Sequence, residues 1–264
     1  MIEEYTMNNN EIRMLNILRE LKQEFGVFGV KSEFEAEGIR TDEIVRLNEV
    51  IYRADLDSYI KIGGCEAIRD IDYTRVIGAK GIMAPMIETP FAMQKFINSI
   101  KKVYGDDYKD KDIIINIETK TSFQNLEDIL AVSKDMLDIV CVGRVDLSSS
   151  LNLSRKDIDS KIIYEYVHKI AKIVKEKKKI MGIGGGISLN SLPFLKDVEE
   201  YMDRFETRKI IFPKEVLNKN YNKALKLSME FEILYLKNKC EYYSKMANED
   251  VDRLKMLEER FSKL

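Results

Sequence analysis

Histidine is nearly absent from this chain of 264 residues, which contains a single one, His168. Apolar spacing predicts a helix around it, from about residue 156 to 175, far from the end of any expected strand. A general base has to reach the substrate, so a histidine on an outer helix is badly placed for that role. The near absence of histidine therefore excludes a Ser-His-Asp triad and other histidine-dependent chemistry.

Cysteines and long apolar runs are also scarce. The three cysteines, Cys65, Cys141 and Cys240, are far apart and form no Cys-x-x-Cys motif, which argues against a disulfide framework and against a zinc knuckle. We expect reduced thiols in a cytoplasmic protein. No apolar run is long enough to span a bilayer, and the acidic residues 1–5 lack the apolar core of a signal peptide.

An excess of charge of either sign is missing as well. Lysine and arginine total 43 and aspartate and glutamate total 45, and the two kinds are intermixed along the chain. Such a composition lacks the basic footprint of a nucleic-acid binder. We therefore expect no nucleic acid as a partner, and the lack of a long apolar run predicts no membrane partner either.

The chain does contain a regular alternation of short apolar runs and amphipathic segments. The runs that predict strands lie near residues 26–33, 59–62, 81–87, 112–117, 137–142, 179–186 and 202–207. This alternation predicts an α/β fold, and at this length a (β/α)8 TIM-type barrel is favoured over an open doubly wound sheet. The eighth strand is either cryptic or replaced by an N-terminal helix. No Gly-, Pro- or Ser-rich linker interrupts the pattern, so we expect a catalytic barrel over residues 1–213 and a helical C-terminal extension over 214–264.

Two of the predicted strands are followed by a carboxylate. Glu118 comes directly after the run 112–117, and Asp146 lies four residues beyond the run 137–142, with a helix-like stretch between the two runs. Strand, helix and strand would bring both acids to the same edge of a parallel sheet. Each acid alone is more simply a solvated loop residue, but the pair at equivalent strand ends suits Mg²⁺ or Mn²⁺.

Basic residues also follow predicted strands. Lys61 would point one ammonium into the mouth of the barrel, where it would stabilise an anion, although a lysine extended along the rim is an equal alternative. Arg208 and Lys209 could hold a carboxylate or phosphate, and could equally cap a helix or pair with Glu206.

A glycine-rich segment, Gly182-Ile183-Gly184-Gly185-Gly186, ends the sixth predicted strand. It lacks the Gly-Lys-Ser/Thr of a P-loop and the spacing of a dinucleotide-binding motif. Its backbone amides could still approach an anion, but a tight turn between strand and helix is the simpler interpretation.

These segments together resemble the HpcH/HpaI aldolase/citrate lyase family, over roughly residues 10–210. The motifs that carry the resemblance are Ile117-Glu118-Thr119, Asn125 to Leu130, Val142 to Leu151, and Ala84-Pro85-Met86. The resemblance implies a pyruvate-kinase-like barrel with carbon–carbon lyase activity. In that family, residues equivalent to Glu118 and Asp146 bind a divalent metal, which stabilises an enolate together with an arginine.

The chain departs from the family pattern at two places. The family arginine corresponds to Lys61, which cannot make the bidentate contact of a guanidinium. A segment that supplies an acid and a histidine in several family aldolases reads Lys31-Ser32-Glu33-Phe34-Glu35 here. We therefore assign proton transfer to Glu33 or Glu66, with Glu35 or a metal-bound water as further alternatives to the missing base.

Our leading hypothesis is a divalent-metal-dependent lyase that acts on an oxo-acid or a related carboxylate or acyl substrate. Glu118 and Asp146 would hold Mg²⁺ or Mn²⁺, Lys61 would stabilise the enolate, and Arg144, Arg208 and Lys209 would bind substrate. The alternatives are an enzyme that forms or isomerises bonds of phosphoenolpyruvate or pyruvate, and a degenerate barrel used for binding. The apolar stripe of the C-terminal helices most simply packs on its own barrel. Helices appended after a barrel in this family often cross to a neighbouring subunit, so the resemblance implies a homo-oligomer.

Overall fold

Eight strands close into one barrel in the computed structural model, which describes residues 7–34 and 37–261. The strands are β1 Gly29–Glu33, β2 Asp57–Lys61, β3 Gly81–Ala84, β4 Asp112–Ile117, β5 Ile139–Gly143, β6 Ile180–Gly184, β7 Arg204–Glu206 and β8 Ile210–Pro213. Neighbouring strands from β1 to β7 are parallel and follow chain order. The predicted TIM-type barrel is confirmed, and the open doubly wound alternative is wrong.

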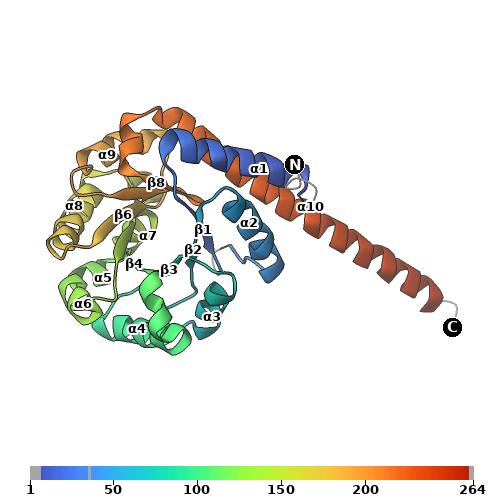
Figure 1. Ribbon diagram of the computed structural model, residues 1–264, viewed down its shortest axis with the longest axis horizontal. Helices are drawn as coiled ribbons and strands as arrows, with labels where there is room; N and C mark the ends of the chain where they lie inside the picture. Colours follow the sequence, from blue (N-terminus) through green and yellow to red (C-terminus); the bar gives the residue numbers. More distant parts are fainter. Residues whose placement is uncertain (1–6, 35–36, 262–264) are drawn as a thin grey trace.

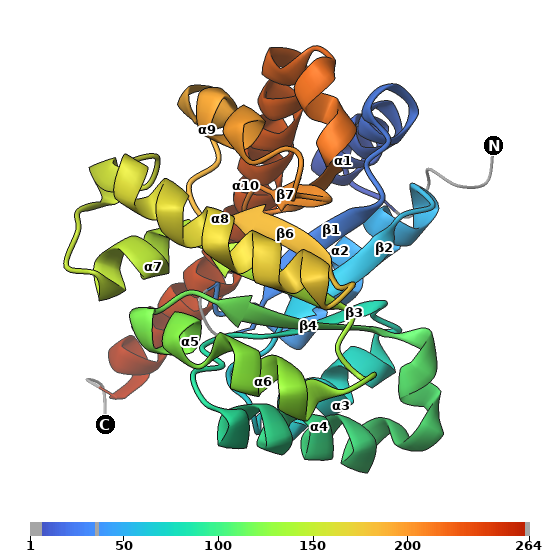
Figure 2. The same cartoon turned by 90° about the vertical axis from the view of Figure 1, so that its left-hand side faces the viewer.

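Helices surround the barrel and also extend beyond it (Figure 1). Their bounds are α1 Asn9–Glu20, α2 Thr41–Arg53, α3 Ile68–Val76, α4 Pro90–Tyr104, α5 Lys120–Gln124, α6 Leu126–Ser133, α7 Arg144–Ser150, α8 Lys161–Glu176, α9 Leu192–Asp197 and α10 Tyr221–Phe261. A second view, along the flank of the barrel, shows α8 lying across β6 and α1 beside α10 (Figure 2). None of the described helices is both long and apolar enough to cross a membrane.

The eighth strand departs from the expected alternation. It is antiparallel to both β7 and β1, with Glu206 opposite Ile211 and Val30 opposite Ile210. Only residues 207–209 separate β7 from β8, and so short a connection can join only antiparallel strands, because a parallel crossover needs a dozen residues or more. The eighth strand is thus cryptic, and the alternative that an N-terminal helix replaces it is wrong.

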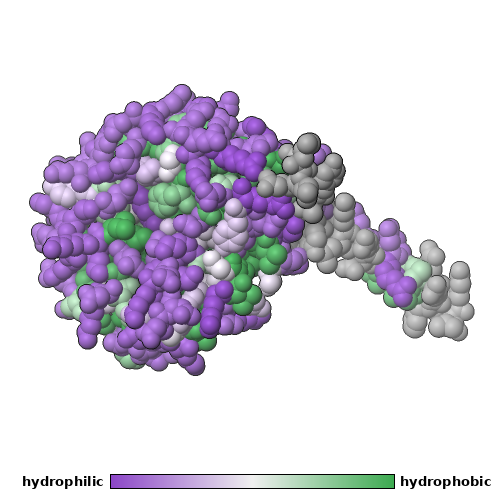
Figure 3. All heavy atoms as spheres, viewed as in Figure 1, coloured by the Kyte–Doolittle hydropathy of each residue, from purple (hydrophilic) through white to green (hydrophobic). Residues whose placement is uncertain are grey.

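The long helix α10 has two different parts. Its first part packs beside α1, and its buried side chains, among them Tyr221, Ala224 and Phe231, belong to the main apolar core. Its far part projects away from the barrel and exposes Val251 and Leu254. Figure 3 shows this projecting end beside a barrel surface on which hydrophilic residues dominate. The extension that we expected from residue 214 is therefore continuous with the barrel core at its start.

A second apolar cluster fills the barrel interior around Tyr59. Its hydroxyl donates to Asp112 Oδ2 at 2.8 Å. The ring leaves no room on either side, since a β-carbon at Gly81 would lie 2.0 Å from Tyr59 Cδ1 and one at Gly29 would lie 2.5 Å from Cε2. The two glycines therefore leave room for a large aromatic side chain in the barrel interior.

Gly81→Ala is expected to lower the free energy of unfolding by about 1–3 kcal/mol, because overpacking forces the Tyr59 ring out of its position. Urea denaturation followed by circular dichroism measures the change. Gly64→Ala is the matched control, since a β-carbon there meets nothing within 4 Å. Equal stability of the two variants would contradict this account of the packing.

Candidate active site

A cavity of about 960 Å³ opens at the carboxyl ends of the parallel strands. Its walls come from strand ends, from the glycine segment after β6 and from the first part of α10. The side chains that line it include Lys31, Glu33, Lys61, Asn116, Glu118, Cys141, Asp146, Glu206, Arg208, Asn222, Leu225, Ser228, Met229 and Glu232. The carboxyl ends of barrel strands are where enzymes of this architecture place their chemistry.

Glu118 follows β4 directly and is 1% exposed. Its Oε1 accepts from the backbone N–H of Met86 at 3.0 Å, and its Oε2 accepts from Asn116 Nδ2 at 3.1 Å. Burial raises the pKa of Glu118 above its ordinary value and Asp146 raises it further, while Lys61 and the two hydrogen bonds oppose the rise. A cation placed beside this carboxylate would offset the cost of burying its charge.

Asp146 lies one strand further along the barrel, in the first turn of α7 rather than in a loop. Its carboxylate lines the same cavity and is close enough to Glu118 to influence its pKa. Gly143 lies between them, and a β-carbon there would be 2.5 Å from Glu118 Oε2. The structure thus brings the two predicted carboxylates together, and the lack of a side chain at Gly143 leaves room for the carboxylate of Glu118.

The oxygen ligands of this corner suit a hard divalent cation. Within the described residues, no group of three or more His, Cys, Asp or Glu could hold a metal ion. A third oxygen is nevertheless present, because Asn116 Oδ1 is buried and has no hydrogen-bond partner among the residues that the structure describes. Mg²⁺ is commonly bound through one or two carboxylates, with the remaining positions left to water and substrate. The residues present therefore fit Mg²⁺ or Mn²⁺.

Lys61 ends β2 and lines the cavity near Glu118. Its ammonium makes no hydrogen bond or ion pair within ranges 7–34 and 37–261. An ammonium without a fixed partner in a cavity is available to an anionic ligand. This placement agrees with the expected position of Lys61 and leaves its role to be tested.

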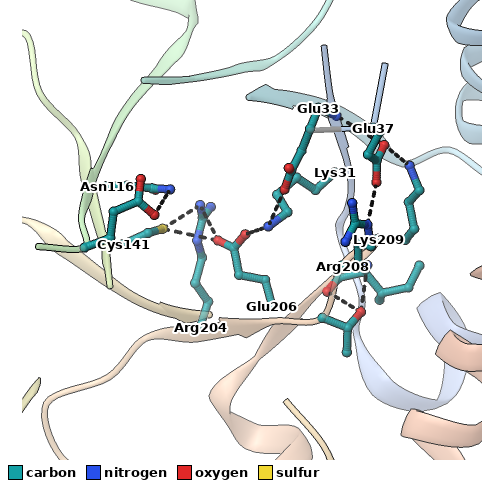
Figure 4. A network of polar contacts seen from close by, with 12 residues as sticks. Lys31, Glu33, Glu37, Asn116, Cys141, Arg204, Glu206, Arg208 and Lys209 are labelled. Carbon is teal, nitrogen blue, oxygen red and sulfur yellow. Dashed lines mark hydrogen bonds and ion pairs between the residues drawn. The ribbon is translucent and has the colours of Figure 1, made fainter. Parts of the chain in front are cut away.

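Lys31 and Glu206 form a buried ion pair on the cavity floor (Figure 4). The Lys31 Nζ lies 2.9 Å from Glu206 Oε2 and 3.6 Å from Glu33 Oε1. The other oxygen of Glu206 accepts from Cys141 Sγ at 3.2 Å and from Arg204 at 3.5 Å. Neither Lys31 nor Arg204 had a role predicted from the sequence. Lys31 and Glu33 are two residues apart on one strand, and so are Arg204 and Glu206 on another. Residues at this spacing point to the same face of a strand, and this was the signal in the sequence that each pair lies on one face.

Glu33 and Glu66, the two candidates for proton transfer, lie in different surroundings. Glu33 lines the cavity and is 9% exposed. Glu66 is exposed and pairs with Lys95 at 3.0 Å on the outer surface, away from the cavity lining. Its assignment to proton transfer is therefore corrected, because the side chain does not face the reaction space. Glu35 lies outside the described residues.

Arg144 is fully buried and is absent from the cavity wall. Its guanidinium pairs with Asp159, donates to the carbonyl oxygens of Gly184 at 3.2 Å and Gly185 at 2.9 Å, and stacks on Phe194. These contacts direct the N–H groups of the guanidinium to partners within the protein. Its assignment to substrate binding is therefore corrected: Arg144 fixes the glycine segment that forms one wall of the cavity.

Arg208 and Lys209 pair with Glu37 rather than with Glu206. Lys209 is 1% exposed, lies over the Tyr235 ring and does not reach the cavity, so its assignment to substrate binding is corrected. Arg208 lines the cavity and its side chain is 51% exposed. Of the two, Arg208 alone is placed to meet a ligand.

The glycine segment forms a tight turn and His168 lies on an outer helix, as the simpler interpretation of each had it. Gly185 and Gly186 have positive φ angles of 81° and 69° and form a tight turn after β6. A β-carbon at Gly185 would lie 2.6 Å from the backbone nitrogen of Arg144, so glycine is required there. His168 packs on α8 between Tyr164 and Tyr201, away from the cavity lining.

Solved structures share this fold at low sequence identity. The HpcH/HpaI aldolase from Desulfitobacterium hafniense DCB-2 is 18% identical, with a TM-score of 0.63 over 83% of this chain and 87% of that chain. An HpcH/HpaI aldolase/citrate lyase family protein from Burkholderia cenocepacia J2315 is 17% identical, with a TM-score of 0.59 over 75% and 82%. The citrate synthase SbnG is 16% identical, with a TM-score of 0.57 over 82% and 89%.

Sequence comparison adds a family match. Residues 60–184 match the HpcH/HpaI aldolase/citrate lyase family, and they include Lys61, Asn116, Glu118 and Asp146. No curated protein matches the chain. The match and the closed barrel confirm the resemblance to the HpcH/HpaI aldolase/citrate lyase family, at a low sequence identity that indicates divergence.

Proposed function

We propose that the protein is a divalent-metal-dependent carbon–carbon lyase that acts on an oxo-acid or a related carboxylate through an enolate. The observation that carries this proposal is one cavity corner where Glu118, Asp146 and the unpartnered Asn116 oxygen lie near the free ammonium of Lys61. A lyase of this type is in keeping with the family.

Each side chain of the corner has a distinct task in this proposal. Glu118, Asp146 and Asn116 would hold Mg²⁺ or Mn²⁺, which when bound spreads the negative charge of an enolate oxygen. Lys61 binds the carboxylate or the enolate oxygen of the substrate. Arg208, which lines the cavity, binds the distal anionic end.

Proton transfer falls to Glu33. In the cleavage direction, its carboxylate takes the proton of the substrate hydroxyl, the oxygen forms a carbonyl, and the carbon–carbon bond breaks. The electron pair of that bond becomes the enolate, and Glu33 returns the proton to the enolate carbon. One substrate thus gives two carbonyl products without a further reactant.

The exchange of pyruvate methyl protons with D₂O tests this function, because it requires an enolate but no knowledge of the full substrate. Proton NMR is expected to show Mg²⁺-dependent exchange that stops when a chelator removes the metal. A parallel Mn²⁺ titration, followed by electron paramagnetic resonance, is expected to show one tight site per chain. Tight Mn²⁺ binding without methyl exchange would indicate a protein that binds the metal but forms no enolate. The absence of both metal binding and exchange would indicate a degenerate barrel.

The same corner also suits the reverse direction, in which an enolate forms a bond. One structural neighbour is described as a citrate synthase. Pyruvate would give the enolate by loss of a methyl proton, and phosphoenolpyruvate by transfer of its phosphoryl group to water. Product analysis separates the two directions, since only cleavage releases an aldehyde or a ketone.

We also propose that the protein is a cytoplasmic homo-oligomer. Support comes from the projecting part of α10, where Val251, Leu254 and Leu257 are 47%, 55% and 45% exposed. Light scattering on a chain that ends near residue 240 tests this, because that cut leaves the buried first part of α10 in place. An unchanged oligomer would show that the projecting part of α10 is not needed for association of the subunits.

A further inference from the structure

Lys31 occupies the cavity floor in a fixed position. It points inward from β1, its side chain is 12% exposed, and its ammonium lies between two carboxylates, those of Glu206 and Glu33 (Figure 4). Burial alone would lower the pKa of Lys31, but Glu206 and Glu33 outweigh it and raise the pKa above its ordinary value. Lys31 therefore carries a proton throughout the neutral range and acts as a cation rather than as a nucleophile.

Glu206 holds this cation in place. Burial would raise the pKa of Glu206, but Lys31 and Arg204 lower it to about 2, so the carboxylate stays ionised. Both of its oxygens are occupied, one by Lys31 and the other by Cys141 and Arg204. Glu206 is thus a structural anchor for Lys31 and is not available as a base.

Glu33 is the acid of this group that lines the cavity and has a carboxylate oxygen outside any ion pair among the described residues. Its backbone N–H donates to Glu37 at 3.3 Å, and the ion pair with Lys31 is the only one that its carboxylate makes among the described residues. Lys61 lies opposite Glu33 in the pairing of β1 with β2, and Lys209 acts on Glu33 through space from the connection between β7 and β8. Lys31 is therefore the one ion-pair partner of the Glu33 carboxylate within the part of the chain that the structure describes.

We infer that Lys31 is a positioning residue for proton transfer, whose ammonium, anchored by Glu206, holds the Glu33 carboxylate in place against the cavity. This inference rests on the proposed enolate function. It assigns to a lysine on the first strand the task of orienting the acid that removes and returns the substrate proton. An acid–base group that is misplaced by about 1 Å can lose about 100-fold in rate.

The experiment compares three substitutions by pyruvate methyl exchange with Mg²⁺ in D₂O. Lys31→Met is expected to lower the exchange rate constant by about 100-fold, with Mn²⁺ affinity and oxaloacetate decarboxylation within about threefold of the original protein. Decarboxylation needs the enolate site but no removal of a proton by Glu33. Lys31→Arg is expected to restore part of the rate. Lys80→Met, which removes an ion-paired lysine outside the cavity lining, is the control and is expected to change nothing.

A double variant separates positioning from simple charge balance. Lys31→Met combined with Glu206→Gln removes one positive and one negative charge, so the net charge of the cluster is kept, while Arg204 loses its carboxylate partner. If Lys31 positions Glu33, exchange stays low in the double variant. Recovery of exchange in the double variant, or loss of decarboxylation together with exchange in Lys31→Met, would overturn the inference. Absence of exchange in the original protein would overturn the proposed function itself, and this inference with it.

Discussion

Asp146→Asn is expected to weaken Mn²⁺ binding by more than about 100-fold, because even partners outside the ligand shell cost 10–100-fold when they are removed. The substitution keeps the size of the side chain and deletes one of the two negative charges of the corner. With Glu118 buried beside a free lysine, the remaining single charge cannot balance a divalent cation. Electron paramagnetic resonance of free Mn²⁺ measures the affinity, and methyl exchange is expected to fall with it.

The control for this substitution is Asp128→Asn. Asp128 lies in the first turn of α6, is exposed, and does not line the cavity. Its substitution is expected to leave Mn²⁺ affinity unchanged. Glu118→Gln, which changes the other carboxylate of the proposed metal site, is expected to weaken Mn²⁺ binding as well. Normal affinity in Asp146→Asn, with the variant folded by circular dichroism, would remove Asp146 from the metal site.

Arg144→Met is expected to lower the free energy of unfolding by about 3–5 kcal/mol, the cost of breaking a buried ion pair by removing one partner. The loss leaves Asp159 without its guanidinium and two carbonyl oxygens of the glycine segment without their donor. The Asp159 side chain is 28% exposed, which favours the lower end of that range. Urea denaturation measures the change.

Arg208→Met is the matched control for Arg144→Met. Both residues pair with a carboxylate near the mouth of the barrel, but the Arg208 side chain is 51% exposed. An exposed ion pair contributes at most about 1 kcal/mol, so a small change is expected. Similar losses of stability in the two variants would mean that the buried contacts of Arg144 do not hold the wall of the cavity.

The barrel was predictable because its strands carry their signal locally. Runs such as Ile113-Ile114-Ile115 are buried on both faces, and amphipathic helices separate them at regular intervals. The eighth strand could not be identified in this way. Ile210–Pro213 is short, follows β7 after three residues, and completes the barrel by pairing on its other side with Val30 and Gly29, about 180 residues earlier in the chain. A pairing at that distance leaves no local pattern.

The candidate site was predictable where a side chain's position follows directly from the end of a strand. Glu118 and Lys61 fall in this class, and both reach the cavity. Arg144, Lys209 and Glu66 also lie near strand ends, but their partners, Asp159, Glu37 and Lys95, come from other segments of the chain. Which of several nearby charges faces the cavity depends on those tertiary pairings, and a sequence pattern does not contain them.

One wall of the cavity belongs to α10, which supplies Asn222, Leu225, Ser228, Met229 and Glu232. The residues assigned to chemistry all lie on strands or directly after them. In the proposed function, catalysis and the shape of the substrate wall would therefore be carried by different parts of the chain. Substitutions along one helix can reshape the wall that the substrate's far end meets while the reacting groups keep their places, so a chain of this design can acquire a new substrate without rebuilding its chemistry.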